Sequence, residues 1–314
     1  MLSLFKKNSF FNSMMLLVYA TILNLIPSLL RPAQADIFGL KGILATIVHI
    51  LFLFIQAVFI NRMIIENRLH RDIMLFPGVF FILFSSLLPA YWNFSHIHIA
   101  NFFMIWSLFE LFQIYKTTNP AVHIFNASFL IGISSIFCGP MLFFLLLIFI
   151  GITNLKKMEL VHPIQIAAGG FGPWFLFITY KVWKGQEREI ADQFLNHFGT
   201  GFFKFEGDSL NTFFTILFGI LTVFLFLSYN EVRKKKHIQA QKKVDILYFS
   251  LITSVLVMVF HSSPGGLVFI MPFIGIFAGL LISNISNLSL ADMLHFLIFL
   301  GALVIQILSL LKII

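Results

Sequence analysis

Long apolar stretches, each about the length of a membrane span, follow one another along the chain with short polar segments between them. A hydrocarbon core of about 30 Å requires roughly 20 apolar residues in a helix. Backbone polar groups inside lipid must be satisfied within the protein, which favours α-helices in stretches of this length. We therefore predict an all-α transmembrane helical bundle, a single domain over residues 1–314, with ten or eleven spans. The expected spans are residues 11–30, 42–61, 73–92, 97–115, 122–137, 140–155, 164–183, 212–229, 245–261, 267–284 and 293–311.

The composition argues against a water-soluble globular protein. Of 314 residues, 59% are hydrophobic and 11% are charged, whereas a typical soluble domain has about 25% charged residues. The single cysteine, Cys138, excludes an internal disulfide framework and a cysteine-based zinc site. The net charge of +8 falls between the apolar stretches, and no basic–aromatic platform accompanies it. We therefore predict membrane lipids as partners and no nucleic acid.

The distribution of lysine and arginine predicts the orientation. In the eleven-span arrangement, 14 of the 21 basic residues share the side of the N-terminus and 7 lie opposite, as the positive-inside rule requires. If residues 122–155 were one broken span, 10 basic residues would lie on the side of the N-terminus and 11 on the opposite side. We therefore predict a cytoplasmic N-terminus and a helical hairpin that turns at Cys138-Gly139-Pro140. We interpret residues 11–30 as a retained first span and not as a cleaved signal peptide.

Two polar segments and several aromatic residues fit this orientation. Residues 184–211, the longest polar insert, are predicted outside, either along the membrane interface or as a plain connecting loop. Residues 231–243 are predicted as a basic cytoplasmic loop, with anionic lipid headgroups as a further ligand. Tyr91, Trp92 and Trp183 fall at predicted external span ends, where such residues anchor helices at the interface.

Polar side chains on the predicted external side form the candidate site. Asp36 is the acid of the first external loop and follows Arg31; His96 and His98 lie in the second external turn, and His261 ends the ninth span. One carboxylate and several imidazoles could bind a divalent cation or orient a phosphate-bearing lipid. No HExxH or EF-hand pattern accompanies them, so no metal ligand is assigned and the cofactor stays unknown.

Several apolar motifs resemble those of a known group of proteins. The segments 124–137 and 143–151, the opening residues 4–9 and the late residues 269–274 resemble an uncharacterised family of Bacteroidota multi-pass inner-membrane proteins. This resemblance implies a location in the bacterial inner membrane and implies no activity.

The acid in the first external loop and the short paired spans at 122–155 carry a second resemblance. The chain is similar to C-type-fold glycosyltransferases, which use polyprenyl-phosphate-linked sugars. That resemblance implies Asp36 as a catalytic base or metal-binding group, and Arg31, His96, His98 and His261 as contacts to the phosphate. The first external loop has only about eleven residues, too few for the two interfacial helices usual in those enzymes.

Three classes of function therefore stay open. The first is a glycosyltransferase or polymerase acting on lipid-linked sugars at the external leaflet. The second is a non-enzymatic component of an envelope, secretion or motility complex, favoured by the lack of a dense polar cluster within the spans. The third is a transporter, although internal repeats and midplane polar groups, typical of transporters, are not evident. The sequence does not decide whether the chain is an enzyme.

Overall fold

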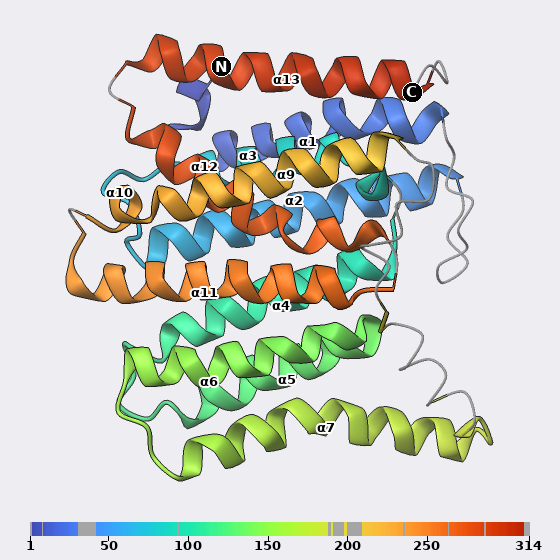
Figure 1. The fold of residues 1–314 in the computed structure, drawn as a ribbon, viewed down its shortest axis with the longest axis vertical. Helices are drawn as coiled ribbons and strands as arrows, with labels where there is room; N and C mark the ends of the chain where they lie inside the picture. The colour runs from blue at the N-terminus through green and yellow to red at the C-terminus, as the bar shows by residue number, and fades with distance from the viewer. Residues whose placement is uncertain are drawn as a thin grey trace. The chain divides into compact units, whose positions relative to one another are not determined.

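The chain folds into α-helices throughout the part that the structure describes (Figure 1). Within that part there are twelve α-helices, joined in places by short 3-10 turns, so the predicted all-α class is confirmed. The structure, a computed structural model, describes residues 2–7, 9–30, 42–92, 94–187, 190, 198–199, 209–234, 236–262, 264–285 and 287–310.

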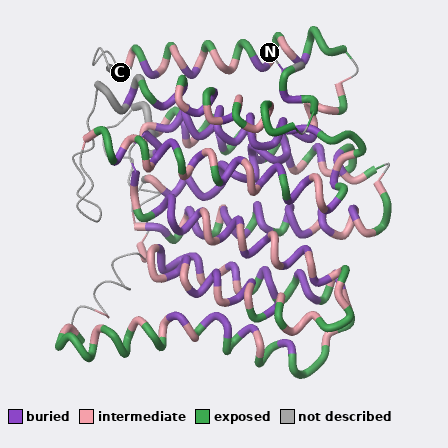
Figure 2. The backbone as a smooth tube through the Cα atoms, turned by 180° about the vertical axis from the view of Figure 1, so that it is seen from behind, coloured by how far each residue is buried: buried purple, intermediate pink, exposed green. Residues whose placement is uncertain are grey.

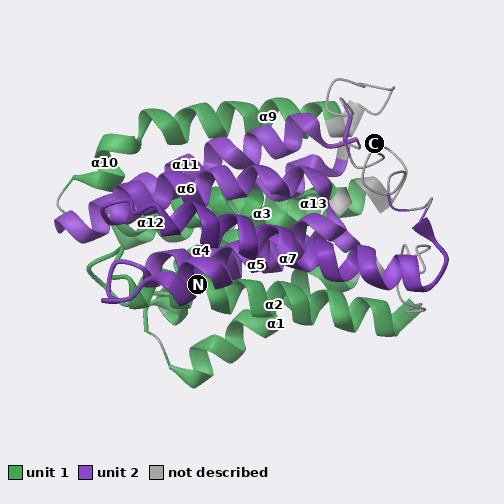
Figure 3. Cartoon of the chain, turned by 90° about the horizontal axis from the view of Figure 1, so that it is seen from below, with its two compact units in different colours: residues 1–95, 205–236, 271–314 green, residues 96–204, 237–270 purple. Residues whose placement is uncertain are grey.

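Two compact units divide the chain, where the sequence indicated a single domain (Figure 3). Unit 1 comprises Met1–Ser95, Phe205–Lys236 and Met271–Ile314, and unit 2 comprises His96–Lys204 and His237–Ile270. The sequence did not indicate this division, because each unit is built from segments that are far apart in the chain and are joined only by contacts between helices.

The core of unit 1 is the packing of α3 against α12. Every residue of α3 is buried, as are Met271 to Leu280 of α12. A Cβ atom added to Gly275 would lie 2.5 Å from the Cα of Phe81, so glycine allows the two backbones to approach closely. The helices of this unit are α1 (Phe10–Leu30), α2 (Gly42–Glu66), α3 (Phe76–Leu87), α9 (Ser209–Leu227), α10 (Tyr229–Arg233), α12 (Met271–Ser283) and α13 (Leu288–Leu310).

Polar contacts attach α13 to the rest of unit 1. The Tyr19 hydroxyl on α1 lies 3.0 Å from Nε2 of His295 on α13. Further along, the Gln306 amide donates to the carbonyl oxygens of Leu23, at 2.8 Å, and Ser86, at 3.1 Å. Hydrogen bonds of this kind join helices where no hydrophobic force drives them together, as between helices in lipid.

Unit 2 contains the predicted hairpin. Helix α5 ends at Phe137, the backbone of Cys138 is extended, and a 3-10 turn over Gly139–Leu142 leads into α6. These elements confirm the predicted break. Its physical cause is Pro140, which disfavours helical backbone in the residue before it. Figure 1 shows α5 and α6 side by side. The helices of this unit are α4 (His96–Gln113), α5 (Ala121–Phe137), α6 (Phe143–Leu155), α7 (Val161–Trp183) and α11 (Ile238–Phe260).

Small residues bring α7 close to α5. A Cβ atom added to Gly132 would lie 2.4 Å from the carbonyl oxygen of Gly170, and one added to Gly169 would lie 2.7 Å from that of Phe125. The indole nitrogen of Trp174 donates to the Ser135 hydroxyl at 2.7 Å. The glycine-rich segment of α7 therefore serves helix packing, as its apolar surroundings indicate.

Three described helices are long and apolar enough to cross a membrane, namely α2, α11 and residues Leu288–Leu308 of α13. Others are short: α3 has 12 residues and α12 has 13. At 1.5 Å per residue, α3 is about 18 Å long, less than a hydrocarbon core of about 30 Å. Short helices of this kind are tolerated at membrane depth where protein surrounds them. The count of about eleven spans stays a prediction.

Two expectations about surface segments differ from the structure. Residues 231–243 were expected as a loop, but most of them are helical. Helix α10 extends to Arg233, and α11 already begins at Ile238. Lysine, glutamine and alanine favour helix, which extends α11 beyond its apolar part. Tyr91 and Trp92, expected as interfacial anchors, are buried in protein, and the Trp92 indole donates to the Ser86 carbonyl at 2.8 Å. The predicted external segment 184–211 falls largely outside the described residues.

Candidate functional site

The predicted external site residues are only partly described. Arg31 and Asp36 lie outside the described residues. His96 and His98 begin α4 and do not lie in a turn as expected. Residues two apart lie about 200° around a helix and do not face each other. Accordingly His96 is exposed and His98 is completely buried, so the two imidazoles do not form a pair on one face. Although His96 is exposed, the protein around its ring removes part of its hydration, and this desolvation lowers the pKa of His96 below its ordinary value.

His261 is buried at the end of α11. Its ring lies edge-on to Phe269, with centroids 5.6 Å apart, and its backbone forms a bridge with Phe198. Asn101, one turn after His98, donates to the carbonyl oxygen of Val268 at 3.2 Å. The start of α4 therefore lies beside the turn that follows His261. Across the described residues, no group of three His, Cys, Asp or Glu is placed to hold a metal ion.

Charged side chains gather at another place in unit 2, where α4 and α6 end and α11 begins. We call Lys116, Lys156, Lys242 and Lys243 the lysine cluster. Lys116 follows the end of α4, Lys156 caps the end of α6, and the other two lie in the second turn of α11. Helix ends bring them together, so the cluster combines segments that are distant in sequence.

Hydrogen bonds hold the lysine cluster in place. The Lys156 ammonium donates to the carbonyl oxygens of Thr117 and Thr118, between α4 and α5. The Asn154 amide donates to the backbone carbonyl of Lys242 at 3.2 Å, which joins the end of α6 to the start of α11. Positive charge favours helix C-termini, so Lys156 is also well placed for the dipole of α6.

Lys243 is completely buried, which is unusual for a lysine. Its Nζ lies 5.6 Å from the ring centroid of Phe112 and 5.9 Å from that of Tyr115. The Nζ of Lys242 lies 6.0 Å from the same tyrosine ring. Aromatic faces attract cations, by about 2 kcal/mol or more where water is excluded. Tyr115 therefore helps two neighbouring cations to lie together despite their repulsion.

An acid–base pair joins α4 to α5 in the same unit. Oε2 of Glu110 on α4 lies 2.7 Å from Nδ1 of His123 on α5, and the two side chains are 17% and 26% exposed. Glu110 falls within the predicted span 97–115, and nothing in the sequence identifies His123 as its partner. The only sequence signal for this pair is a carboxylate in an apolar stretch, which requires a polar neighbour.

This arrangement is suited to bind phosphate. Lysine ammonium groups bind phosphate as point charges. Lys116 is exposed and Lys156 and Lys242 are half-buried, so these three are the members of the cluster that a phosphate outside the protein can contact, whereas Lys243 is completely buried. Lysines near an anionic membrane surface each contribute about 1 kcal/mol to lipid binding.

Comparison with known proteins found no matching family model, no matching curated protein and no matching solved structure. What the chain does is therefore inferred from its own residues.

Proposed function

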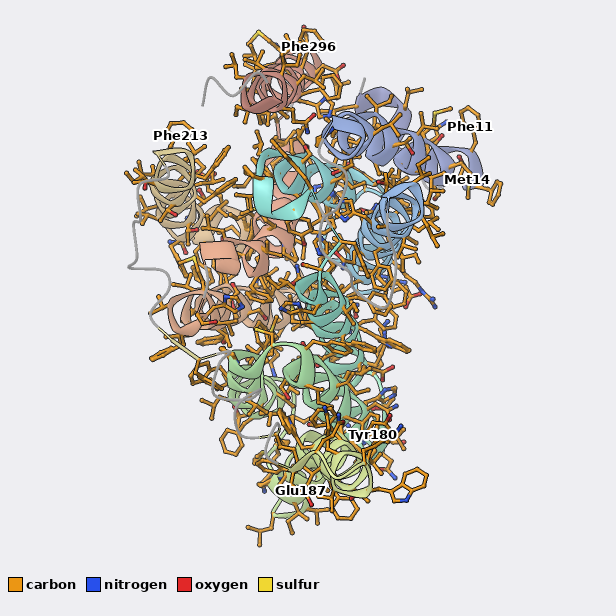
Figure 4. All side chains as sticks on the ribbon, turned by 90° about the vertical axis from the view of Figure 1, so that its right-hand side faces the viewer. Phe11, Met14, Tyr180, Glu187, Phe213 and Phe296 are labelled. Carbon is orange, nitrogen blue, oxygen red and sulfur yellow. The ribbon has the colours of Figure 1, made fainter. Side chains whose placement is uncertain are left out.

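We propose that this chain is a multi-pass protein of a bacterial inner membrane that binds phosphate-bearing lipids at the lysine cluster. The distribution of exposed apolar side chains carries the membrane part of the proposal. Leu160 is 92% exposed, Leu227 79% and Phe175 70%. Phe11, Phe213 and Phe296, from three different helices, point outward in Figure 4. Exposure of each such side chain to water would cost about 1.5–3 kcal/mol, and contact with lipid would remove this cost.

Polar side chains support the same proposal by their burial. His49, Gln56, His98, Asn101 and Lys243 are all buried, although asparagine, glutamine and lysine are mostly exposed in soluble proteins and histidine is intermediate. Polar residues in membrane proteins face the interior of the bundle, away from the acyl chains. The combination of exposed phenylalanine and buried histidine, amide and lysine is expected when lipid is the solvent.

The position of the lysine cluster supports the lipid-binding part. Its residues lie at helix ends, where headgroups are found if the helices cross a membrane. The positive-inside rule assigns this end to the cytoplasm, where the leaflet carries anionic lipids.

Lipid binding is tested by removing the cluster's charges. In the triple variant Lys116→Gln, Lys156→Gln and Lys242→Gln, retention of phosphatidylglycerol should weaken about 100-fold, since each lysine contributes about 1 kcal/mol. Native mass spectrometry of purified, delipidated protein would measure the retention. A matched control removes three lysines from elsewhere, through Lys181→Gln, Lys184→Gln and Lys234→Gln. If both triple variants lost the same affinity, nonspecific charge would explain the binding and the site would be rejected.

The multi-pass topology has its own test. In a Cys138→Ser background, which loses only a buried thiol, Gln239→Cys introduces a label site near the start of α11. We expect no reaction with a membrane-impermeant maleimide in intact spheroplasts and full reaction after lysis. Labelling of intact spheroplasts would place this end of α11 outside the cell.

A lipid-linked sugar transferase is the second candidate function. The helix break at residues 138–142 supports it, because short paired helices belong to the resemblance described above. We propose Asp36 as the base or metal-binding group, with Arg31, His96 and His261 as contacts for the phosphate. Asp36→Asn should abolish complementation of a deletion strain at matched protein level, and His96→Ala should weaken it less. Full complementation by Asp36→Asn would remove the transferase proposal.

A further inference from the structure

A cavity of about 290 Å³ lies in unit 1, between the first half of α1 and the last turns of α2. Its volume is close to the lower end of small-ligand sites, which begin near 300 Å³. The polar part of the lining is Ser13, Asn61, Arg62 and Glu66, and the apolar part is Leu16, Val58, Ile65 and Leu75. The cavity thus combines a few hydrogen-bonding groups with apolar walls.

Asn61 gives the clearest sign of a ligand. Its side chain is 2% exposed, and its Oδ1 accepts a hydrogen bond from the backbone N–H of Gly78 at 2.8 Å, at the start of α3. Its Nδ2 has no hydrogen-bond partner among the described residues. A buried amide donor without a partner costs about 1–3 kcal/mol. A ligand oxygen in the cavity would remove that cost.

Arg62 and Glu66 determine which ligand charge fits. Nε of Arg62 lies 2.6 Å from Oε1 of Glu66, one turn later on α2. A purely anionic group in the cavity would face the Glu66 carboxylate, and a purely cationic group would face the Arg62 guanidinium. A group that carries both charges can bind its anion to Arg62 and its cation to Glu66.

Apolar surface continues beside the cavity. Phe10, Phe11 and Met14 are exposed on α1 next to Ser13, and Figure 4 shows Phe11 and Met14 pointing away from the helix. An acyl chain attached to a bound headgroup would find apolar contacts there. The cavity alone suits a headgroup, and the cavity with this face suits a lipid.

We propose that the α1–α2 cavity binds the headgroup of an ethanolamine phospholipid. The phosphate oxygens accept from Asn61 Nδ2 and from Arg62, and the primary ammonium donates to Glu66. A choline headgroup has no N–H to donate, and a glycerol headgroup has no cation. This inference rests on the proposed membrane location, but its residues are separate from the lysine cluster of unit 2.

The test uses the purified, delipidated full-length protein and three dihexanoyl lipids with ethanolamine, choline or glycerol headgroups. Native mass spectrometry should show saturable retention of the ethanolamine lipid at about tenfold lower concentration than the other two. Glu66→Gln should remove this preference, and Arg62→Gln should weaken retention of all three lipids about tenfold, the usual effect of losing one charged hydrogen bond. Arg71→Gln, which removes an arginine outside the cavity lining, is the matched control and should change nothing.

Asn61→Asp keeps the acceptor for Gly78 and removes the donor, so it should weaken retention, while a thermal melt checks that the variant is folded. Free phosphoethanolamine should bind at least tenfold more weakly than the lipid, because it lacks the acyl chains. Equal binding of the free headgroup would overturn the assignment to a lipid. Equal retention of the three lipids, or an ethanolamine preference that survives Glu66→Gln, would overturn the site. Both results are independent of the lysine cluster variants, so either proposal can fail alone.

Discussion

Helices α12 and α7 are both rich in apolar residues, although α7 is the more polar of the two, and their surroundings are opposite. In α12 the residues from Met271 to Leu280 are buried against protein, mainly α3. In α7 the small residues Gly169 and Gly170 face protein, while large side chains such as Phe171 and Phe175 are exposed (Figure 2, where α7 is the lowest helix). An apolar sequence therefore does not show whether other helices cover its large side chains or whether these side chains stay exposed on the protein surface.

The largest effect is expected where α12 meets α3. Gly275→Leu would place side-chain atoms within 2.5 Å of the Phe81 backbone, which cannot move without separating the helices. We expect a loss of about 3 kcal/mol or more in the free energy of unfolding. The control Gly301→Leu is in the same unit with nothing within 4 Å of the added Cβ, and should be nearly neutral. Thermal unfolding in detergent would compare them, and equal melting temperatures would contradict the close packing.

A charge on the exposed face of α7 tests what covers that face. Phe175→Asp would be nearly neutral on a water-exposed surface, within about 0.5 kcal/mol. Near the middle of a lipid-facing helix it should cost about 3 kcal/mol of membrane insertion. Leu160→Asp, just before α7, is the control and should insert normally, because a helix end can reach the headgroups. Insertion into isolated membranes would be measured, and normal insertion of both variants would contradict lipid coverage.

A smaller effect, a gain in stability, is expected at the turn between α2 and the buried α3. Arg68 has a φ of 51°, and its N–H and that of Leu69 donate to the carbonyls of Ile65 and Ile64. This left-handed position at a helix end suits glycine, and a side chain there costs about 1 kcal/mol. Arg68→Gly should therefore stabilise the protein by about that amount. Asn67→Gly, one residue earlier, should destabilise it, and the same melting assay would show the opposite signs.

The smallest effect is a pH dependence at the same turn. Burial, together with the nearby charge of Lys236, lowers the pKa of His70 below its ordinary value, and Asp72 and Asn284 oppose this shift. The unfolded chain then binds a proton more readily than the folded one. The free energy of unfolding should be highest above the ordinary histidine pKa of about 6.5. It should fall as the pH drops from there through the lower pKa that His70 has in the folded protein. His70→Gln should reduce the change of the melting temperature between pH 7.5 and 5.5. An unchanged slope would show that His70 is not responsible.

Local sequence rules were sufficient for much of the fold. The segment Cys138-Gly139-Pro140 predicted the helix break that the structure shows. The candidate site was less accessible to such rules. The contact of Lys243 with Phe112, and that of Glu110 with His123, join different helices, and no spacing within the sequence specifies them.

The exposed face of α7 allows the most direct test of the membrane proposal. In the Cys138→Ser background, Leu176→Cys on that face and Glu187→Cys beyond the end of α7 would each carry a nitroxide label in reconstituted bilayers. Both positions are exposed, and Figure 4 shows the Glu187 region at the end of α7. The label at position 176 should collide often with oxygen and rarely with a water-soluble nickel chelate, and the label at 187 should show the reverse. Strong collision of the 176 label with the nickel chelate would contradict lipid coverage of α7.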